Sequence, residues 1–160
     1  KNLSRVFREH ADFNNPAFIV KTILAHRQNH SINTTFELKK LFSRHVSYKN
    51  ENKFFARLFQ AIRIEVNDEL NALKELLIQS LDVLKPSGRL VIISYHSIED
   101  KIVKKFMKFG NFLNSPKKDF FGNPSFAFKL ISKKPVVPTS LEIKLNKKAR
   151  SAKLRVCEKI

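Results

Sequence analysis

The sequence predicts an α/β protein, in which part of a doubly wound sheet follows a small all-helical domain. Apolar residues recur at the helical period from Phe55 to Leu84, and the turn residues of 85–88 end this pattern. The next segment, 89–94, is apolar on both faces, which is typical of a strand inside a parallel sheet. A second amphipathic helix over 98–106 follows directly. Helix, buried strand and helix in this order form half of a doubly wound sheet.

The helical domain is predicted over residues 1–54. Asn15 and Pro16 indicate a helix start, because Asn is a good cap and Pro favours the first helical position. Thr34 and Glu37 have the spacing of a capping box, which predicts a short helix after Thr34. The apolar residues that follow each start recur at helical spacing, so both segments can contribute to one small core.

The second domain is predicted over residues 55–160. Before it, the polar stretch SYKNENK at 47–53 is expected to be a loop. The long helical pattern that opens the domain contains Asn67 and Asp68, which are both good caps, so it is expected to divide there into two helices.

The C-terminal part of the chain continues the α/β pattern. Residues 126–131 and 152–160 are predicted to be strands, and Thr139 or Ser140 is expected to cap a short helix between them. A short connection of this kind permits a hairpin-like pair of strands at the edge of the sheet. The stretch 111–124 is predicted to be a loop.

The charge is strongly positive and unevenly distributed. The net charge of the chain is +17. Residues 1–54 carry ten Lys/Arg and four Asp/Glu, residues 55–100 carry five and seven, and residues 101–160 carry sixteen and three. Two basic flanks around a weakly acidic middle indicate a polyanionic partner, most often nucleic acid. The alternative is a generally basic proteome, in which the lysine-rich faces are only solvated.

Cysteine content and hydropathy exclude several classes of protein. Cys157 is the only cysteine, so an internal disulfide framework is excluded, and a reducing compartment such as the cytoplasm is expected. No apolar run approaches the roughly 18 residues of a membrane span. His26 and His30 lie four residues apart, but no Cys or acidic residue is suitably spaced nearby, so no metal site is predicted.

A polar cluster follows the strand 89–94. In open α/β sheets, ligands bind outside the carboxyl ends of the strands, where Ser94, Tyr95 and His96 lie in this prediction. Ser97 and Asp100 match a capping box, which explains those two residues by structure alone. Ser94, Tyr95 and His96 are left as either part of a tight turn or the wall of an active site.

Four stretches resemble one enzyme family in their order and spacing. They are FQAIRIEVNDEL (59–70), LKPSGRLVIISYHSIEDKIVKKF (84–106), KPVVPTSLEI (134–143) and KARSAKLRVCEK (148–159). The family is that of the S-adenosylmethionine-dependent methyltransferases (RsmH, formerly MraW) that methylate N4 of a cytidine in bacterial 16S ribosomal RNA. The resemblance covers nearly the whole chain. The departures are Ser87 for Gly, Tyr95 for Phe, Lys101 for Arg, and Lys147-Lys148 in place of Asn-Pro-Arg.

The resemblance implies a Rossmann-like methyltransferase fold of which this chain is the C-terminal part. Residues 1–54 would be the inserted helical substrate-recognition domain, and residues 55–160 the C-terminal part of the methyltransferase domain. The family's Gly-rich cofactor loop, acidic ribose-binding position and Asp-Leu-Gly-Val-Ser-Ser stretch do not occur in this sequence. No residue that binds S-adenosyl-L-methionine can therefore be assigned here, and we expect this chain alone to be a fragment without activity.

The resemblance also assigns roles to the polar cluster. His96 would accept a proton or hydrogen-bond the target base, Tyr95 would stack on the base, and Ser94 would line the same pocket. In the family topology, strand 89–94 lies against a strand that this sequence lacks, so we expect an open apolar edge and self-association through it.

The basic flanks would bind the small ribosomal subunit. The predicted contacts with RNA phosphates are Arg5, Arg8, Lys21, Arg27, Lys39, Lys40, Arg44, Arg150, Lys153 and Arg155. Arg57 and Arg63 are expected to pair instead with Glu65, Asp68 or Glu69. The alternative function is a basic module that binds RNA or the ribosome without catalysis.

Overall fold

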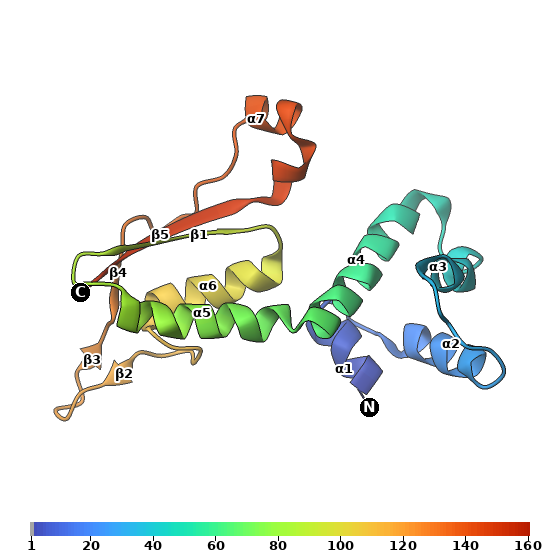
Figure 1. Ribbon diagram of the computed structural model, residues 1–160, viewed down its shortest axis with the longest axis horizontal. Coiled ribbons are helices and arrows are strands. Elements are labelled where there is room, and N and C mark those ends of the chain that lie inside the picture. Colours follow the sequence, from blue (N-terminus) through green and yellow to red (C-terminus); the bar gives the residue numbers. More distant parts are fainter. Residues whose placement is uncertain (1) are drawn as a thin grey trace. The chain divides into compact units, whose positions relative to one another are not determined.

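The computed structural model describes residues 2–160, and the chain divides into two compact units (Figure 1). The first unit extends to Glu69, and the second is Leu70–Ile160. This division lies fifteen residues beyond the predicted boundary at 54/55, because the helix that follows residue 47 packs with the first unit. Within the described residues, no helix is long and apolar enough to cross a membrane.

The first unit is all-helical within the described residues. Its helices are α1 (Asn2–Glu9), α2 (Ala17–Arg27), α3 (Thr35–Ser43) and α4 (Tyr48–Asn67). Phe7, Ile19, Phe42 and Leu58, one from each helix, are almost fully buried in a shared core. The core is rich in phenylalanine, and the ring centroids of Phe42 and Phe54 lie 5.5 Å apart.

The helix starts of the first unit confirm one prediction and shift another. Thr34 caps α3 in a reciprocal capping box with Glu37, as predicted. At α2, Pro16 itself occupies the N-cap position, and Asn15 acts one residue earlier, where its Oδ1 accepts a hydrogen bond from the Ala17 amide (3.1 Å).

The predicted loop at 47–53 was wrong, because α4 begins at Tyr48. This first turn is polar and lies at the surface, where it does not need an apolar face. Glu51 favours the helix N-terminus and also pairs with Lys39 of α3 (3.1 Å). The predicted division at 67–68 is confirmed. Asp68 has a left-handed backbone (φ 51) and ends α4 with a hydrogen bond from its amide to the Ile64 carbonyl.

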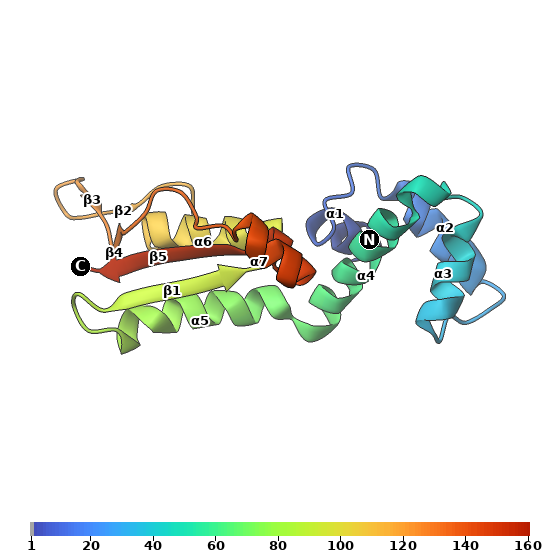
Figure 2. The same cartoon turned by 90° about the horizontal axis from the view of Figure 1, so that it is seen from above.

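The second unit places two helices on one face of a small antiparallel sheet (Figure 2). Its elements are α5 (Glu69–Val83, from Leu70 on), β1 (Arg89–Ser94), α6 (Ser97–Phe109), β4 (Phe128–Leu130), α7 (Ser140–Leu145), a 3₁₀ helix (Lys147–Ser151) and β5 (Lys153–Lys159). The sheet order is β1-β5-β4. Leu77 of α5, Phe106 and Met107 of α6, and Cys157 of β5 form the buried centre. Thr139 caps α7, as predicted.

The segment predicted as a loop over 111–124 contains a small hairpin. Lys117–Lys118 (β2) pairs antiparallel with Pro124–Ser125 (β3).

The doubly wound sheet is not present in the described residues. Strand β1 was predicted to lie inside a parallel sheet, but here it is an edge strand that pairs antiparallel with β5. Leu90 and Ile92 pack against the core, whereas Val91 and Ile93 on the other face are 54% and 53% exposed. Apolar residues on both faces indicate a strand that can be covered on both sides, but they do not fix the direction of its neighbours.

Candidate functional site

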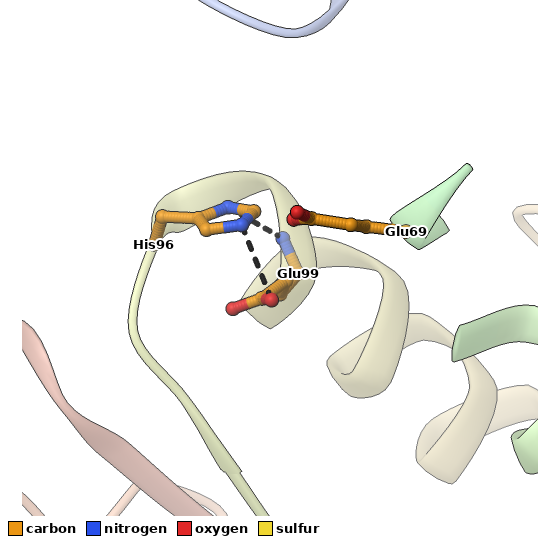
Figure 3. Close-up of side chains that lie close together, drawn as sticks. All are labelled: Glu69, His96 and Glu99. Atoms are coloured by element: carbon orange, nitrogen blue, oxygen red, sulfur yellow. Dashed lines mark hydrogen bonds and ion pairs between the residues drawn. The ribbon is translucent and has the colours of Figure 1, made fainter. Parts of the chain in front are cut away.

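The turn between β1 and α6 is held by hydrogen bonds of Glu99 (Figure 3). His96 is the N-cap of α6, and its Nδ1 accepts a hydrogen bond from the Glu99 amide (3.3 Å). The Nε2 atom of His96 lies 3.2 Å from Glu99 Oε1. The other carboxylate oxygen of Glu99 accepts a hydrogen bond from the Tyr95 amide (3.1 Å). The Glu99 amide thus holds the ring of His96, and the Glu99 side chain holds the backbone amide of Tyr95.

This geometry corrects the predicted capping box of Ser97 and Asp100. The helix begins at Ser97, so the capping position falls on His96, with Glu99 three residues later. The sequence pattern favoured Ser97, because serine is among the commonest capping residues and histidine is not. His96, left unexplained by the sequence pattern, therefore has a definite structural role.

Asp100 is buried and joins α6 to β5. It is 7% exposed, and its Oδ1 lies 2.7 Å from Nε of Arg155. Its Oδ2 accepts hydrogen bonds from Nη2 of Arg155 (3.2 Å) and Nζ of Lys153 (3.1 Å). Burial by itself raises the pKa of this carboxyl, but the hydrogen bonds from Arg155 and Lys153 outweigh it, so the pKa lies below the ordinary 3.8.

The three predicted pocket residues lie in different environments. Ser94 is 3% exposed, and its Oγ lies 3.5 Å from the Lys153 carbonyl oxygen. The side chain of His96 is 12% exposed, whereas Tyr95 is 57% exposed. In a neutral ring, an Nδ1 that accepts a hydrogen bond places the ring proton on Nε2. Tyr95 is therefore the member of the cluster with open surface for a ligand.

The described residues do not form a glycine-rich cradle for a nucleotide-like cofactor. The three glycines are Gly88 in the turn before β1, Gly110 at the C-terminal end of α6 and Gly122 in the β2–β3 hairpin. None of them lies at a strand-to-helix turn, where backbone amides hold such groups. These residues alone do not fit S-adenosyl-L-methionine.

The structure divides the predicted RNA contacts into two groups. Arg5, Lys39, Lys153 and Arg155 are paired with acidic residues: Arg5 with Glu9 and Glu65, Lys39 with Glu51, and the other two with Asp100. Arg8, Lys21, Arg27, Lys40, Arg44 and Arg150 are exposed and have no ion pair within residues 2–160. Arg63 pairs with Glu69 (2.8 Å), as expected, whereas Arg57 donates to backbone carbonyls of residues 11 and 12 and lies over the Phe13 ring.

A basic pocket in the second unit was not predicted from the sequence. Lys104, Lys108, Lys133 and Arg155 line a cavity of about 300 Å³ together with Met107. A signal was present in the sequence, because Lys104 and Lys108 are four residues apart and so share one face of α6. The third lysine comes from a distant segment, so the pocket itself could not be predicted from local spacing.

The comparisons with known proteins agree with one another. The sequence profile described as "MraW methylase family" matches residues 1–160. A protein of Flavobacterium johnsoniae is 48% identical over 160 residues, which is all of this chain and 53% of that protein. A relative from Amoebophilus asiaticus is 49% identical over 157 residues, which is 98% of this chain and 51% of that protein. A relative from Flavobacterium psychrophilum is 48% identical over 158 residues, which is 99% of this chain and 54% of that protein. All three are named "Ribosomal RNA small subunit methyltransferase H". The chain spans about half the length of these relatives.

Proposed function

Because the chain belongs to the MraW methylase family, we propose that it is part of a cytoplasmic enzyme that methylates N4 of a cytidine in 16S ribosomal RNA. S-adenosyl-L-methionine is the proposed methyl donor. The observation that carries this proposal is the family match over all 160 residues, together with relatives named as small-subunit ribosomal RNA methyltransferases. Because this chain spans only about half of those relatives, the proposal concerns the whole protein of which it is a part.

The proposed chemistry requires alignment and removal of a proton. The lone pair of the cytosine N4 amino group is delocalised into the ring, so the amine must be held in line with the methyl group that it attacks. A proton must also leave N4 during or after the transfer. The methyl donor supplies an electrophilic carbon, and we propose that the residues that bind it lie outside this chain.

We propose that the turn before α6 forms one wall of the cytidine pocket. Tyr95 is exposed and would stack on the target base. His96 would hold Tyr95 in position, because its ring caps the helix and is fixed by Glu99. Ser94 would stabilise the start of the turn, since its side chain is buried. In this arrangement His96 is a positioning residue, and direct proton transfer by its imidazole is the alternative.

Two substitutions of His96 separate these roles in the complete protein. His96→Asn keeps an oxygen that can cap α6, whereas His96→Ala removes the cap. We expect His96→Asn to retain most of the methylation rate on small ribosomal subunits, and His96→Ala to lose at least about tenfold with a lower thermal midpoint. If His96→Asn loses as much activity as His96→Ala at unchanged stability, the imidazole itself takes part in the chemistry, and the positioning role is wrong.

We propose that the exposed cations without an ion pair contact RNA phosphates. The basic pocket lined by Lys104, Lys108 and Lys133 is a further proposed contact. Such contacts release counterions, so binding should weaken steeply as salt concentration rises. The second candidate function, an RNA-binding module without catalysis, is favoured by the net charge of +17 alone. Salt-sensitive binding to small subunits without any methylation by the complete protein would support that alternative. The free edge of β1 supports the further proposal that this chain, on its own, associates with itself.

A further inference from the structure

The β2–β3 hairpin places two aromatic rings in solvent. Phe120 and Phe121 form its tip and are 97% and 84% exposed. Their ring centroids lie 5.5 Å apart with an interplanar angle of 87°, so the edge of one ring meets the face of the other. Phenylalanine is usually buried, and a phenylalanine pair at a surface tip marks a contact surface more often than an isolated exposed side chain does.

The turn that presents these rings is ordered by its own hydrogen bonds. The Asp119 carboxylate accepts hydrogen bonds from the amides of Phe121 (2.9 Å) and Asn123 (2.8 Å). The Asp119 carbonyl accepts a hydrogen bond from the Gly122 amide (3.0 Å), and Gly122 has a left-handed backbone (φ 84) that favours glycine. The tip is therefore pre-organised, and little conformational freedom remains to be lost on binding.

The surroundings of the two rings are basic. Lys117 and Lys118 precede them in β2 and are exposed. Between residues 115 and 135 the lysines are 117, 118, 129, 133 and 134, whereas Asp119 is the only acidic residue. The carboxylate of Asp119 already accepts hydrogen bonds within the turn. Aromatic rings beside exposed cations have the chemistry that binds single-stranded nucleic acid, in which bases stack and phosphates pair.

We propose that Phe120 and Phe121 stack on unpaired bases of ribosomal RNA, with Lys117 and Lys118 on the adjacent phosphates. This inference rests on the proposed function, which supplies the RNA, and adds a second contact to it. Figures 1 and 2 show the hairpin near the C-terminal end of the chain, past the end of α6, whereas His96 precedes the other end of that helix. A helix of 13 residues is about 20 Å long, so the hairpin would contact a nucleotide other than the target cytidine.

The test compares variants of the complete protein in binding to protein-free 16S ribosomal RNA at one fixed salt concentration. Replacing both rings by leucine keeps an apolar tip but removes the aromatic faces. We expect Phe120→Leu/Phe121→Leu to weaken binding about tenfold or more, and Phe120→Tyr/Phe121→Tyr to bind as the wild type does. Val83→Ala is the control, because Val83 is an apolar side chain that is 81% exposed at the end of α5, outside the hairpin, and we expect no change.

Salt dependence separates stacking from phosphate contact. The leucine pair should leave the slope of log affinity against log salt unchanged, whereas Lys117→Ala/Lys118→Ala should reduce its magnitude by about 1–2. Unchanged affinity of the leucine pair would overturn the proposal. A loss that occurs with assembled subunits but not with protein-free RNA would also overturn it, because the hairpin would then contact a protein.

Methylation by the wild type distinguishes this proposal from the proposed function. If the wild type methylates and the leucine pair binds normally, only the hairpin proposal fails. If the wild type does not methylate but the leucine pair weakens RNA binding, the hairpin proposal stands and the enzymatic function fails. If the wild type does not bind the protein-free RNA, the hairpin proposal fails, and methylation of small ribosomal subunits alone decides the enzymatic function.

Discussion

Replacing Asp100 by asparagine should destabilise the second unit strongly, because it leaves a buried arginine without its counter-charge. The side chains of Asp100 and Arg155 are only 10% and 11% exposed, and two hydrogen bonds join them. Removing one partner of such a buried pair costs about 3–5 kcal/mol. Lys153 adds little to this, because its side chain is 40% exposed and exposed pairs contribute about 0–1 kcal/mol. We therefore expect a loss of about 3 kcal/mol for Asp100→Asn.

Hydrogen exchange of the β5 amides measures this loss in the unit concerned, since the chain has two units and global unfolding need not be two-state. Glu158→Gln is the matched control. It removes an ion pair with Arg89 across the same sheet, but the Arg89 side chain is 64% exposed, so the cost should stay below about 1 kcal/mol. A loss below about 1 kcal/mol for Asp100→Asn, or an equal loss for Glu158→Gln, would refute the reasoning.

The pH dependence of the same pair has a definite sign. The pKa of Asp100 in the folded protein lies below 3.8, since hydrogen bonds from Arg155 and Lys153 outweigh the effect of burial. A depressed folded pKa gives stability that is fully present above about pH 3.8 and is lost as the pH falls through the folded pKa. The stability difference between wild type and Asp100→Asn should therefore shrink below pH 3.8. A difference that is constant down to pH 2 would contradict this linkage.

Two further predictions concern local features. Thr34→Ala removes the cap of α3 and should cost about 1 kcal/mol of the stability of the first unit, measured by chemical denaturation, whereas Thr34→Ser should cost almost nothing. Cys157 is fully buried, and burial raises the pKa of its thiol to about 12. The folded protein at pH 8 should therefore not react with a thiol reagent that labels the denatured protein completely, and rapid labelling of the folded protein would show that this core opens.

Local sequence patterns were sufficient to predict those features that depend only on neighbouring residues. The capping box of Thr34 and Glu37 and the helix break at Asp68 were predictable, because each depends on contacts within four residues. The start of α4 at Tyr48 was missed, since a polar first turn has the composition of a loop. The cap at Thr34 was predictable and the cap at His96 was not, because threonine is strongly preferred at the N-cap position and histidine is not.

Contacts between segments that are distant in the chain could not be predicted from the sequence. The pairing of Asp100 with Arg155 joins residues 55 apart, and no local pattern indicates it. Arg155 was expected to contact RNA because it is a cation in a basic segment, but charge does not reveal burial. Phe120 and Phe121 illustrate the opposite case. They lie in the stretch 111–124, which was predicted to be a loop, but their exposure together at an ordered hairpin tip became visible only in the fold.

The strand β1 shows what an apolar pattern determines and what it does not. Leu90 and Ile92 face α5 and α6, so one half of the pattern is explained within the second unit. Val91 and Ile93 face the opposite side, where the described residues leave them about half exposed. A strand that is apolar on both faces is suited to a sheet with cover on both sides, and a doubly wound sheet is such a structure. The apolar pattern thus indicates that both faces of the strand can be covered. The antiparallel pairing with β5 depends instead on the path of the chain through 110–152, which residue type alone does not determine.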